Sequence, residues 1–254
     1  MAQDEVSTSV DGHVGMVGIH RPPDNYFDVS LVRQLADALD ELAARPEVRA
    51  AVVFAEGRNF CAGARLDGGE GDPSRGPETL YREGLRLWHH RLPMVAAVRG
   101  AAVGGGLGLA LAADFRVAAE RTRFVCNFAK LGFHQGFGIS VTLPAVVGQQ
   151  RALELLYTGG MLRGREALEA GLCDRLVAED HVVDEAVALA TEIAGSGPLA
   201  VAAIRTTMRG AMAEQLSAAM ARESEAQLSL APTEDFAEGV RAMGERRTPR
   251  FVGR

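Results

Sequence analysis

The chain has 254 residues, of which 47% are hydrophobic and 24% are charged, and these proportions are typical of a globular protein. Its net charge of -6 argues against nucleic acid or an anionic membrane surface as the main partner. Glycine is abundant, with 29 residues, but no period of three is present, which excludes a collagen-like chain, and the apolar content excludes disorder. We therefore expect the glycines to serve particular positions of a folded core.

The cysteines and the apolar segments indicate the cellular compartment. Cys61, Cys126 and Cys173 are odd in number and far apart, which favours a reducing cytosol and no metal site. The N-terminal segment lacks the basic and apolar parts of a signal peptide. The most apolar stretch, residues 94–115, is interrupted by Arg99 and Asp114, so it predicts buried core and no membrane span. We expect a cytoplasmic protein.

Strand-like and helix-like segments alternate through the first half of the chain. The elements predicted there, in chain order, are a strand at Val14–Ile19, a helix capped by Ser30, a buried strand at 48–54, a helix at 78–90, a second buried strand at 94–98, a helix at 109–113, and strands at 115–118 and 122–126. The later pattern is helical, with helices predicted at 151–157, 165–170, 182–194, 198–209, 212–228 and 233–244. Strand–helix units followed by helices predict an α/β core with a helical C-terminal part.

Two glycine-containing segments each follow a predicted buried strand. They are residues 60–66, with the sequence FCAGARL, and residues 100–108, with the sequence GAAVGGGLG. Small residues at a strand end let a ligand approach the main chain closely, and free N–H groups at the start of a helix attract negative charge. Two such N–H groups directed at one oxygen form an oxyanion hole. Taken singly, either segment is also typical of a tight, closely packed turn.

Together, these segments resemble the motifs of the enoyl-CoA hydratase/isomerase (crotonase) superfamily, and the resemblance covers nearly the whole chain. The first oxyanion-hole motif is matched by GRNFCAGARL, the second by PMVAAVRGAAVGGGLGLALAADFRVA, and the first strand, turn and helix by IHRPPDNYFDVSLVRQLADALDEL. The C-terminal half and tail are matched by EALEAGLCDRLVAEDHVVDEAVALA, SGPLAVAAIR and ERRTPRFVG. The resemblance implies an α/β fold built as a spiral of ββα units. It also implies a crotonase-like core at 1–195 carrying an acyl-CoA site, and a C-terminal helical oligomerisation region at 196–254 that forms a homotrimer or a dimer of trimers.

The resemblance assigns roles to particular residues. The oxyanion donors would be the backbone N–H groups of Ala64 and Gly105, which would hold the thioester oxygen of an acyl-CoA as it becomes an enolate. Coenzyme A enters as part of the substrate, so no separate cofactor is implied. Contacts with the ligand are expected from Ala62, Ala64, Arg65, Leu66, Gly105, Gly108, Phe128 and Leu131, although Arg65 stands where the family usually has aspartate. The tail residues Arg246, Arg247 and Phe251 either meet the CoA phosphate or adenine or form a solvated basic tail.

The chain departs from the family at the positions of the two catalytic glutamates. An ungapped comparison places Gly108 and Phe128 there, and neither side chain can transfer a proton. His134 is the best titratable replacement, since histidine titrates near neutral pH, although it could also be a hydrogen-bonded histidine at a helix start or a subunit contact. Tyr81 and Glu83, on the helix after the acidic loop, are weaker candidates.

Other polar residues are interpreted as structural. His89 and His90 are adjacent and would point to different sides of a helix, Asp114 would be a structural aspartate, and Asp28 would cap a helix. Asp67, Glu70 and Asp72 are expected in a solvated loop. A triad of Ser140, His134 and an aspartate has no sequence spacing to support it.

The function that the resemblance implies is that of an enoyl-CoA hydratase/isomerase-like enzyme, a lyase or isomerase of acyl-CoA and fatty acid breakdown, without the usual glutamates. The first alternative is a divergent hydrolase, decarboxylase or C–C lyase that uses the same enolate. The second is a catalytically silent acyl-CoA-binding subunit. The wall residues Phe128, Phe133 and Phe137 suggest an apolar or bulky acyl group.

Overall fold

The computed structural model describes residues 5–66, 72 and 76–254. Within these residues a six-stranded sheet has the order β1-β2-β3-β4-β6-β9, and a three-stranded sheet has the order β5-β7-β8. The strands are β1 (Val6–Asp11), β2 (Val14–Ile19), β3 (Ala50–Ala55), β4 (Met94–Val98), β5 (Ala101–Val103), β6 (Phe115–Ala119), β7 (Arg123–Val125), β8 (Met161–Arg163) and β9 (Arg175–Val177). In the larger sheet β1 and β2 are antiparallel and the other neighbours are parallel, as strand–helix connections require.

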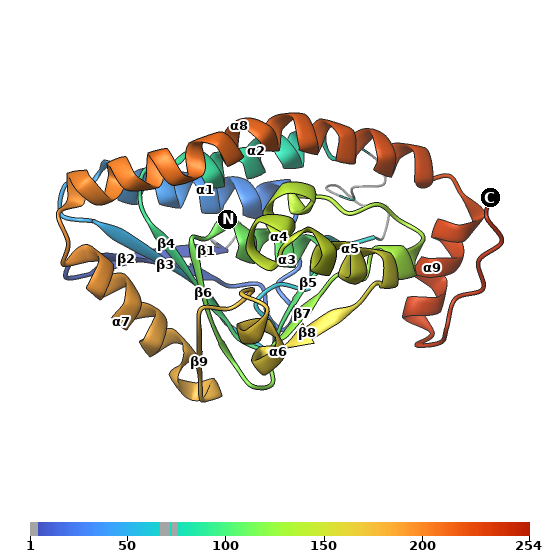
Figure 1. The fold of residues 1–254 in the computed structure, drawn as a ribbon, viewed down its shortest axis with the longest axis horizontal. Coiled ribbons are helices and arrows are strands. Elements are labelled where there is room, and N and C mark those ends of the chain that lie inside the picture. The colour runs from blue at the N-terminus through green and yellow to red at the C-terminus, as the bar shows by residue number, and fades with distance from the viewer. Residues whose placement is uncertain (1–4, 67–71, 73–75) are drawn as a thin grey trace.

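The helices cover both faces of the larger sheet and extend beyond it (Figure 1). They are α1 (Val29–Ala44), α2 (Glu78–His89), α3 (Gly105–Ala112), α4 (Ile139–Val147), α5 (Gln149–Thr158), α6 (Gly164–Glu169), α7 (Val182–Ala194), α8 (Pro198–Leu230) and α9 (Glu234–Gly244), with the short 3-10 helices η2 (Ala129–Leu131) and η3 (Glu179–His181). Helix α7 packs on β3, β4 and β6, α8 packs on α2 and α4, and α9 packs on η2.

The central strands are buried on both faces. In β3, Ala50 and Val52 pack in the cluster that contains α7, whereas Ala51 and Val53 pack in the cluster that contains α1 and α2. Successive side chains of a strand point to opposite faces, so a strand covered on both sides needs a continuous apolar run. The predicted α/β core with buried parallel strands is therefore confirmed.

The first helix begins earlier than its sequence suggested. Asp28 is the N-cap, and its carboxylate accepts a hydrogen bond from the N–H of Leu31 at 2.9 Å. Ser30 lies inside the helix, so the prediction that it caps α1 is wrong, and the capping role considered for Asp28 is confirmed. Asp28 also pairs with Arg21 at 2.7 Å, which lowers the pKa of the carboxyl against the opposing effect of its burial.

The C-terminal half differs most from the prediction. The two helices expected at 198–209 and 212–228 are one helix, α8, because a single glycine at position 210 costs only about 1 kcal/mol, less than tertiary packing supplies. Helix α4 was not predicted, since Gly138 at its N-cap and Pro144 in its interior are both typical of loops. The division of the chain at residue 195 stays a prediction.

Among the described residues, no single helix is long and apolar enough to cross a membrane. The helical segments 179–194 and 198–230 together have the length and apolar composition of a membrane span, but the chain bends by 106° between them.

Candidate active site

The two glycine-containing segments run side by side after their strands. Phe60 donates its N–H to the carbonyl of Arg99 at 2.9 Å, Cys61 donates to Ala101 at 3.1 Å, and Val103 donates to Cys61 at 3.0 Å. These backbone hydrogen bonds continue the parallel pairing beyond the C-terminal ends of β3 and β4. They bring together the residues that follow Cys61 and Val103.

Backbone turns at two glycines expose the N–H groups that follow them. Gly63 has φ +91° and Gly104, the N-cap of α3, has φ +53°, a region that favours glycine. A Cβ on Gly63 would lie 3.6 Å from the N atom of Gly105, so the segments nearly touch there. Within the described part of the chain, neither Ala64 nor Gly105 donates its N–H to a backbone carbonyl outside a helix or strand, and the first N–H groups of a helix have no partner within it.

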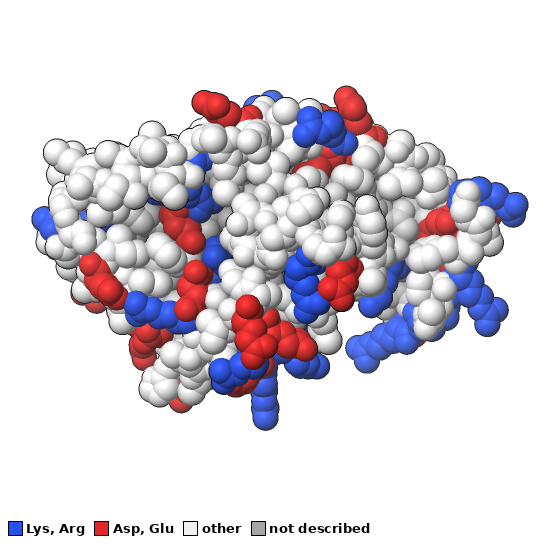
Figure 2. Space-filling model, in the orientation of Figure 1, with Lys and Arg blue, Asp and Glu red and all other residues white. Residues whose placement is uncertain are grey.

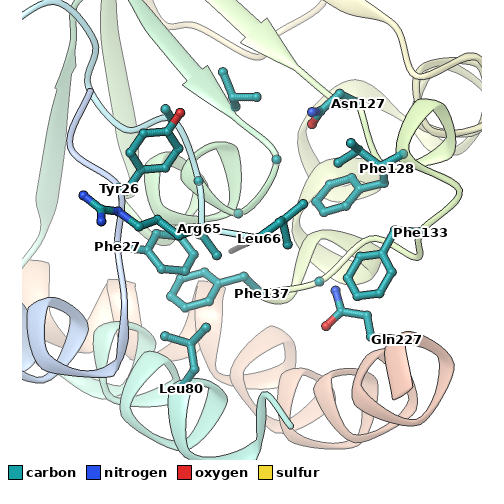
Figure 3. A pocket seen from close by; sticks show the side chains of 18 of the residues that line it. Tyr26, Phe27, Arg65, Leu66, Leu80, Asn127, Phe128, Phe133, Phe137 and Gln227 are labelled. Carbon is teal, nitrogen blue, oxygen red and sulfur yellow. The ribbon is translucent and has the colours of Figure 1, made fainter. Parts of the chain in front are cut away.

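Ala64 and Gly105 both line a cavity of about 500 Å³ (Figure 3). Its lining residues come from both glycine segments, from the β2–α1 turn, from α2, from the segment after β7 and from the two last helices; they are Tyr26, Phe27, Ala62, Gly63, Ala64, Arg65, Leu66, Leu80, Tyr81, Val103, Gly104, Gly105, Asn127, Phe128, Leu131, Phe133, Gly136, Phe137, Gln227, Val240 and Met243. Aromatic residues make up 6% of the chain but supply six of these lining residues. The cavity therefore suits an apolar group larger than a few atoms.

Most of the predicted ligand contacts lie on this cavity. The lining includes Ala62, Ala64, Arg65, Leu66, Gly105, Phe128 and Leu131, together with the aromatic residues Phe133 and Phe137. Gly108 and His134 are not among the lining residues. The guanidinium of Arg65 lies 5.8 Å from the ring centre of Tyr26, so the arginine found in place of aspartate rests on an aromatic face.

Gly108 lies directly behind Phe137. A Cβ added at position 108 would come within 2.9 Å of the carbonyl oxygen and 3.1 Å of the Cβ of Phe137. Any larger side chain at this point of α3 therefore requires the backbone at residue 137 to move. Gly108 packs against Phe137 and does not line the cavity, so its contact with a ligand stays a prediction.

His134 is turned to the backbone and away from the cavity. Its Nδ1 is 2.7 Å from the carbonyl oxygen of Gln135, and its own carbonyl accepts a hydrogen bond from Nε2 of Gln227 at 3.0 Å. Ser140 accepts a bond from the side chain of Gln135 at 3.1 Å and donates its N–H to Glu223. These contacts do not arrange Ser140 and His134 as a triad, and they leave the acid–base role of His134 without geometric support.

A buried polar network links α2 and α8 at the wall of the cavity. Tyr81 of α2 donates its hydroxyl to Oε1 of Gln227 of α8 at 2.7 Å. One turn earlier in α8, the buried carboxylate of Glu223 accepts the N–H groups of Gly138 at 2.8 Å and Ser140 at 3.0 Å. Burial raises the pKa of Glu223, and burial together with the nearby Glu223 raises that of Tyr81, so the Tyr81 hydroxyl stays protonated.

The cavity is poor in groups that could remove a proton. None of the described residues that line it is an aspartate or a glutamate. Cys61 lies next to the lining, but burial raises the pKa of its thiol to about 12, so it is not a thiolate nucleophile. Glu83 pairs with Arg33 and Arg86 and does not line the cavity, whereas its neighbour Tyr81 does. The polar side chains available there come from Tyr26, Arg65, Tyr81, Asn127 and Gln227.

The remaining candidates lie away from the cavity. Asp114 pairs with Arg205 at 2.9 Å and with Arg209 at 2.7 Å, the structural role expected for it. His90 is buried beside this group, and His89 is the last residue of α2. Asp67 and Glu70 fall outside the described residues, and Asp72 is buried, not solvated as expected.

The basic tail folds back on α9. Arg247 pairs with Glu238, the N–H of Val252 donates to Asp235 at 2.6 Å, and Phe251 is 42% exposed. Figure 2 shows basic side chains projecting around this end of the molecule. The tail residues are therefore placed by α9, and the described structure does not bring Arg246, Arg247 or Phe251 into the lining of the cavity.

Several lining residues were not predicted. Phe27 lies in the loop after β2, and its N–H donates to the carbonyl of Gly63 at 3.0 Å. Because loops after strands often carry binding residues, its position in the sequence could have suggested it. Gln227, Val240 and Met243 come from α8 and α9, whose approach to the cavity has no local sequence signal.

Comparisons with known proteins agree with this geometry. The family model described as enoyl-CoA hydratase/isomerase matches residues 10–254. A putative enoyl-CoA hydratase of Thermus thermophilus is 37% identical over 94% of this chain and 98% of its own length. A crystal structure of an enoyl-CoA hydratase/isomerase from Pseudoalteromonas atlantica has a TM-score of 0.86 at 30% identity, covering 98% of this chain and 100% of that one. A carnitinyl-CoA dehydratase structure from Mycobacterium avium has a TM-score of 0.85 at 32% identity, covering 98% of this chain and 99% of that one.

Proposed function

This chain belongs to the enoyl-CoA hydratase/isomerase (crotonase) family, and we propose that it binds an acyl-CoA and stabilises the thioester enolate between the backbone N–H groups of Ala64 and Gly105. The observation that carries the proposal is that Ala64 and Gly105 line the same apolar cavity, with Gly63 packed close to the N atom of Gly105. Fixed donors act most strongly where negative charge develops in a water-poor site. Ala62, Arg65 and Leu66 would then contact the CoA portion, and Phe128 and Leu131 the acyl portion.

We further propose that the reaction runs without the two-glutamate mechanism of hydration. The ungapped comparison with the family places Gly108 and Phe128 at the two positions, and a side chain added at position 108 would collide with Phe137. Phe128 presents an apolar ring to the cavity. Water attack on an enoyl-CoA needs a base to activate the water and an acid to protonate the α-carbon, and the described lining offers only neutral or cationic side chains.

A second candidate, cleavage of a C–C bond by decarboxylation, is favoured by the absence of carboxylates from the described lining. When a carboxylate on the α-carbon leaves as CO₂, the electron pair of the broken C–C bond forms the enolate, so no base is required. The enolate then takes a proton at the α-carbon. Two backbone donors and an apolar cavity supply the stabilisation that this step needs, and a lining without negative charge does not repel the substrate carboxylate.

A screen of CoA thioesters tests these proposals. Crotonyl-CoA is expected to be hydrated about 10²–10⁴ times more slowly than by a dedicated hydratase, because acid–base catalysis is missing. Hydration at an ordinary hydratase rate would contradict the claim that Gly108 and Phe128 remove that mechanism. Release of CO₂ from an acyl-CoA with an α-carboxylate supports the second candidate, and release of free CoA supports a hydrolase. Binding without any product, and without exchange of the α-hydrogen in D₂O, indicates a silent binding subunit.

We also propose that α8 mediates self-association into trimers or dimers of trimers. Ile204 and Met208, one turn apart, are 62% and 75% exposed, and Figure 2 shows few charges over this part of α8. Exposed apolar patches mark interaction sites. Light scattering of Ile204→Glu should give a smaller particle than the unchanged protein. An unchanged mass would contradict the role of this face.

A further inference from the structure

Phe137 has an unusual backbone for its residue type. Its φ is +59°, yet it is a bulky residue and only 1% of its surface is exposed. Bulky side chains rarely adopt this left-handed conformation, and such conformations persist only where the surroundings fix them. Glycine follows at position 138 and precedes at 136, but the strained position itself carries a phenyl ring.

The surroundings that fix Phe137 are side chains of α8. Glu223 holds the N–H groups of Gly138 and Ser140 at 2.8 and 3.0 Å. Gln227 donates to the carbonyl of His134 at 3.0 Å. Both side chains are almost fully buried. The backbone is therefore held by hydrogen bonds on both sides of Phe137.

The ring lies among other aromatic side chains in the wall of the cavity. Its centre lies 5.0 Å from that of Phe27, 6.4 Å from that of Tyr81 and 5.7 Å from that of Trp88. Figure 3 shows it beside Phe27 and above Leu80. Behind it, a Cβ added at Gly84 of α2 would come within 2.8 Å of the ring. The ring is thus packed against α2.

On the basis of the proposed acyl-CoA function, we propose that Phe137 is a specificity-determining residue, whose ring is the floor of the acyl pocket. A closed floor among aromatic side chains selects a compact acyl group that ends in a flat, apolar aryl or conjugated unit. Aromatic pairs gain energy beyond simple burial when they meet edge to face or offset. A long, straight acyl chain would end against the ring without that gain and without room to continue.

The unchanged protein provides the first test. Isothermal titration calorimetry would compare 3-phenylpropionyl-CoA with nonanoyl-CoA, which has the same number of acyl carbons, and with free CoA. We expect the phenyl thioester to bind up to about tenfold more tightly than the straight-chain thioester. Equal affinity, or tighter binding of nonanoyl-CoA, overturns the inference. Failure of every acyl-CoA to bind overturns the proposed function instead.

Two variants test the floor itself. Phe137→Gly removes the ring, and glycine accepts the positive φ without strain, so the fold should be retained; we expect the phenyl preference to disappear and nonanoyl-CoA to bind more tightly. Gly84→Ala pushes the ring into the cavity, and should weaken binding of the phenyl thioester several-fold while free CoA binds as before. Phe54→Leu removes an aromatic ring that does not line the cavity, and is the matched control.

The results separate the possible failures. If Phe137→Gly is folded by circular dichroism and keeps the phenyl preference, the inference is wrong. If that variant does not fold, Gly84→Ala decides, because unchanged affinity for the phenyl thioester would show that the ring does not form the floor. Exchange of the α-hydrogen in D₂O with either thioester supports the proposed function independently of the preference.

Discussion

Two parts of the cavity wall are built from different parts of the chain. One part contains Ala64 and Gly105, which follow turns at Gly63 and Gly104. The other part contains Phe137, and the backbone on both sides of it is held by Glu223 and Gln227, more than eighty residues away in sequence. The first part depends on main-chain geometry that local residues dictate. The second depends on side chains whose meeting is decided by how α8 packs on α2 and α4.

Removal of a backbone donor should have the largest effect. Ala64→Pro deletes one N–H, and turnover should fall by about 10²–10³, as when an oxyanion donor is lost. Ala64→Gly keeps the N–H and is the matched control, with turnover expected to stay within a few-fold. Steady-state kinetics with the best substrate of the thioester screen would measure both variants. Equal turnover of the two variants would show that this N–H does not stabilise the enolate.

A charge placed at position 108 tests the contact between α3 and Phe137. Gly108→Glu should lower the free energy of unfolding by about 2–3 kcal/mol, because the new side chain collides with the backbone of Phe137. Urea denaturation of the double variant Gly108→Glu with Phe137→Gly should recover part of this loss. Additive effects of the two substitutions would contradict the contact between these positions.

Acid should lower the stability of the fold where the end of α2 meets α8. His90 follows α2 and lies beside Arg205, Arg209 and Asp114; burial, and then the charge of Arg205, lower its pKa from 6.5 to about 3. Below about pH 6.5, His90 therefore binds a proton in the unfolded chain but stays neutral in the folded chain. Stability should fall by up to about 1.4 kcal/mol for each pH unit between about pH 6.5 and pH 3, and be fully present above that window.

Replacement of this histidine provides the check on that pH dependence. Urea denaturation of His90→Leu at pH 7 and pH 5 should show a smaller difference than the unchanged protein shows between the same two values. His89→Leu, one residue earlier at the end of α2, is the matched control and should keep the full difference. An identical pH dependence in His90→Leu would exclude His90 as its source.

The smallest expected effect concerns the link between α2 and α8. Tyr81→Phe keeps the ring and removes the hydroxyl that donates to Gln227 at 2.7 Å. Loss of one neutral hydrogen bond in a buried site should cost about 1 kcal/mol of unfolding free energy. The preference between phenyl and straight-chain thioesters should persist, because the ring of Phe137 remains supported by Glu223. Loss of that preference would show that Tyr81 also fixes the floor.

The sequence by itself predicted the elements whose signals are local. The buried strands β3 and β4 are continuous apolar runs between turn residues, and the two glycine segments follow strand ends, so the fold, and the place of these segments beside the cavity, could be predicted from residue order. Helix α4 and the unbroken helix α8 could not be predicted in this way. Gly138, Pro144 and Gly210 each disfavour a helix locally, and only tertiary contacts outweigh that preference.

Only the tertiary structure decided which side chains surround the ring of Phe137. The sequence offered His134 as the acid–base residue and Phe137 as a wall residue; the structure brings Phe137 to the cavity, whereas Nδ1 of His134 lies at the carbonyl of Gln135. The physical reason is that backbone donors are positioned by φ and ψ of a few adjacent residues. Burial, hydrogen bonding and ring contact depend instead on segments far apart in the chain.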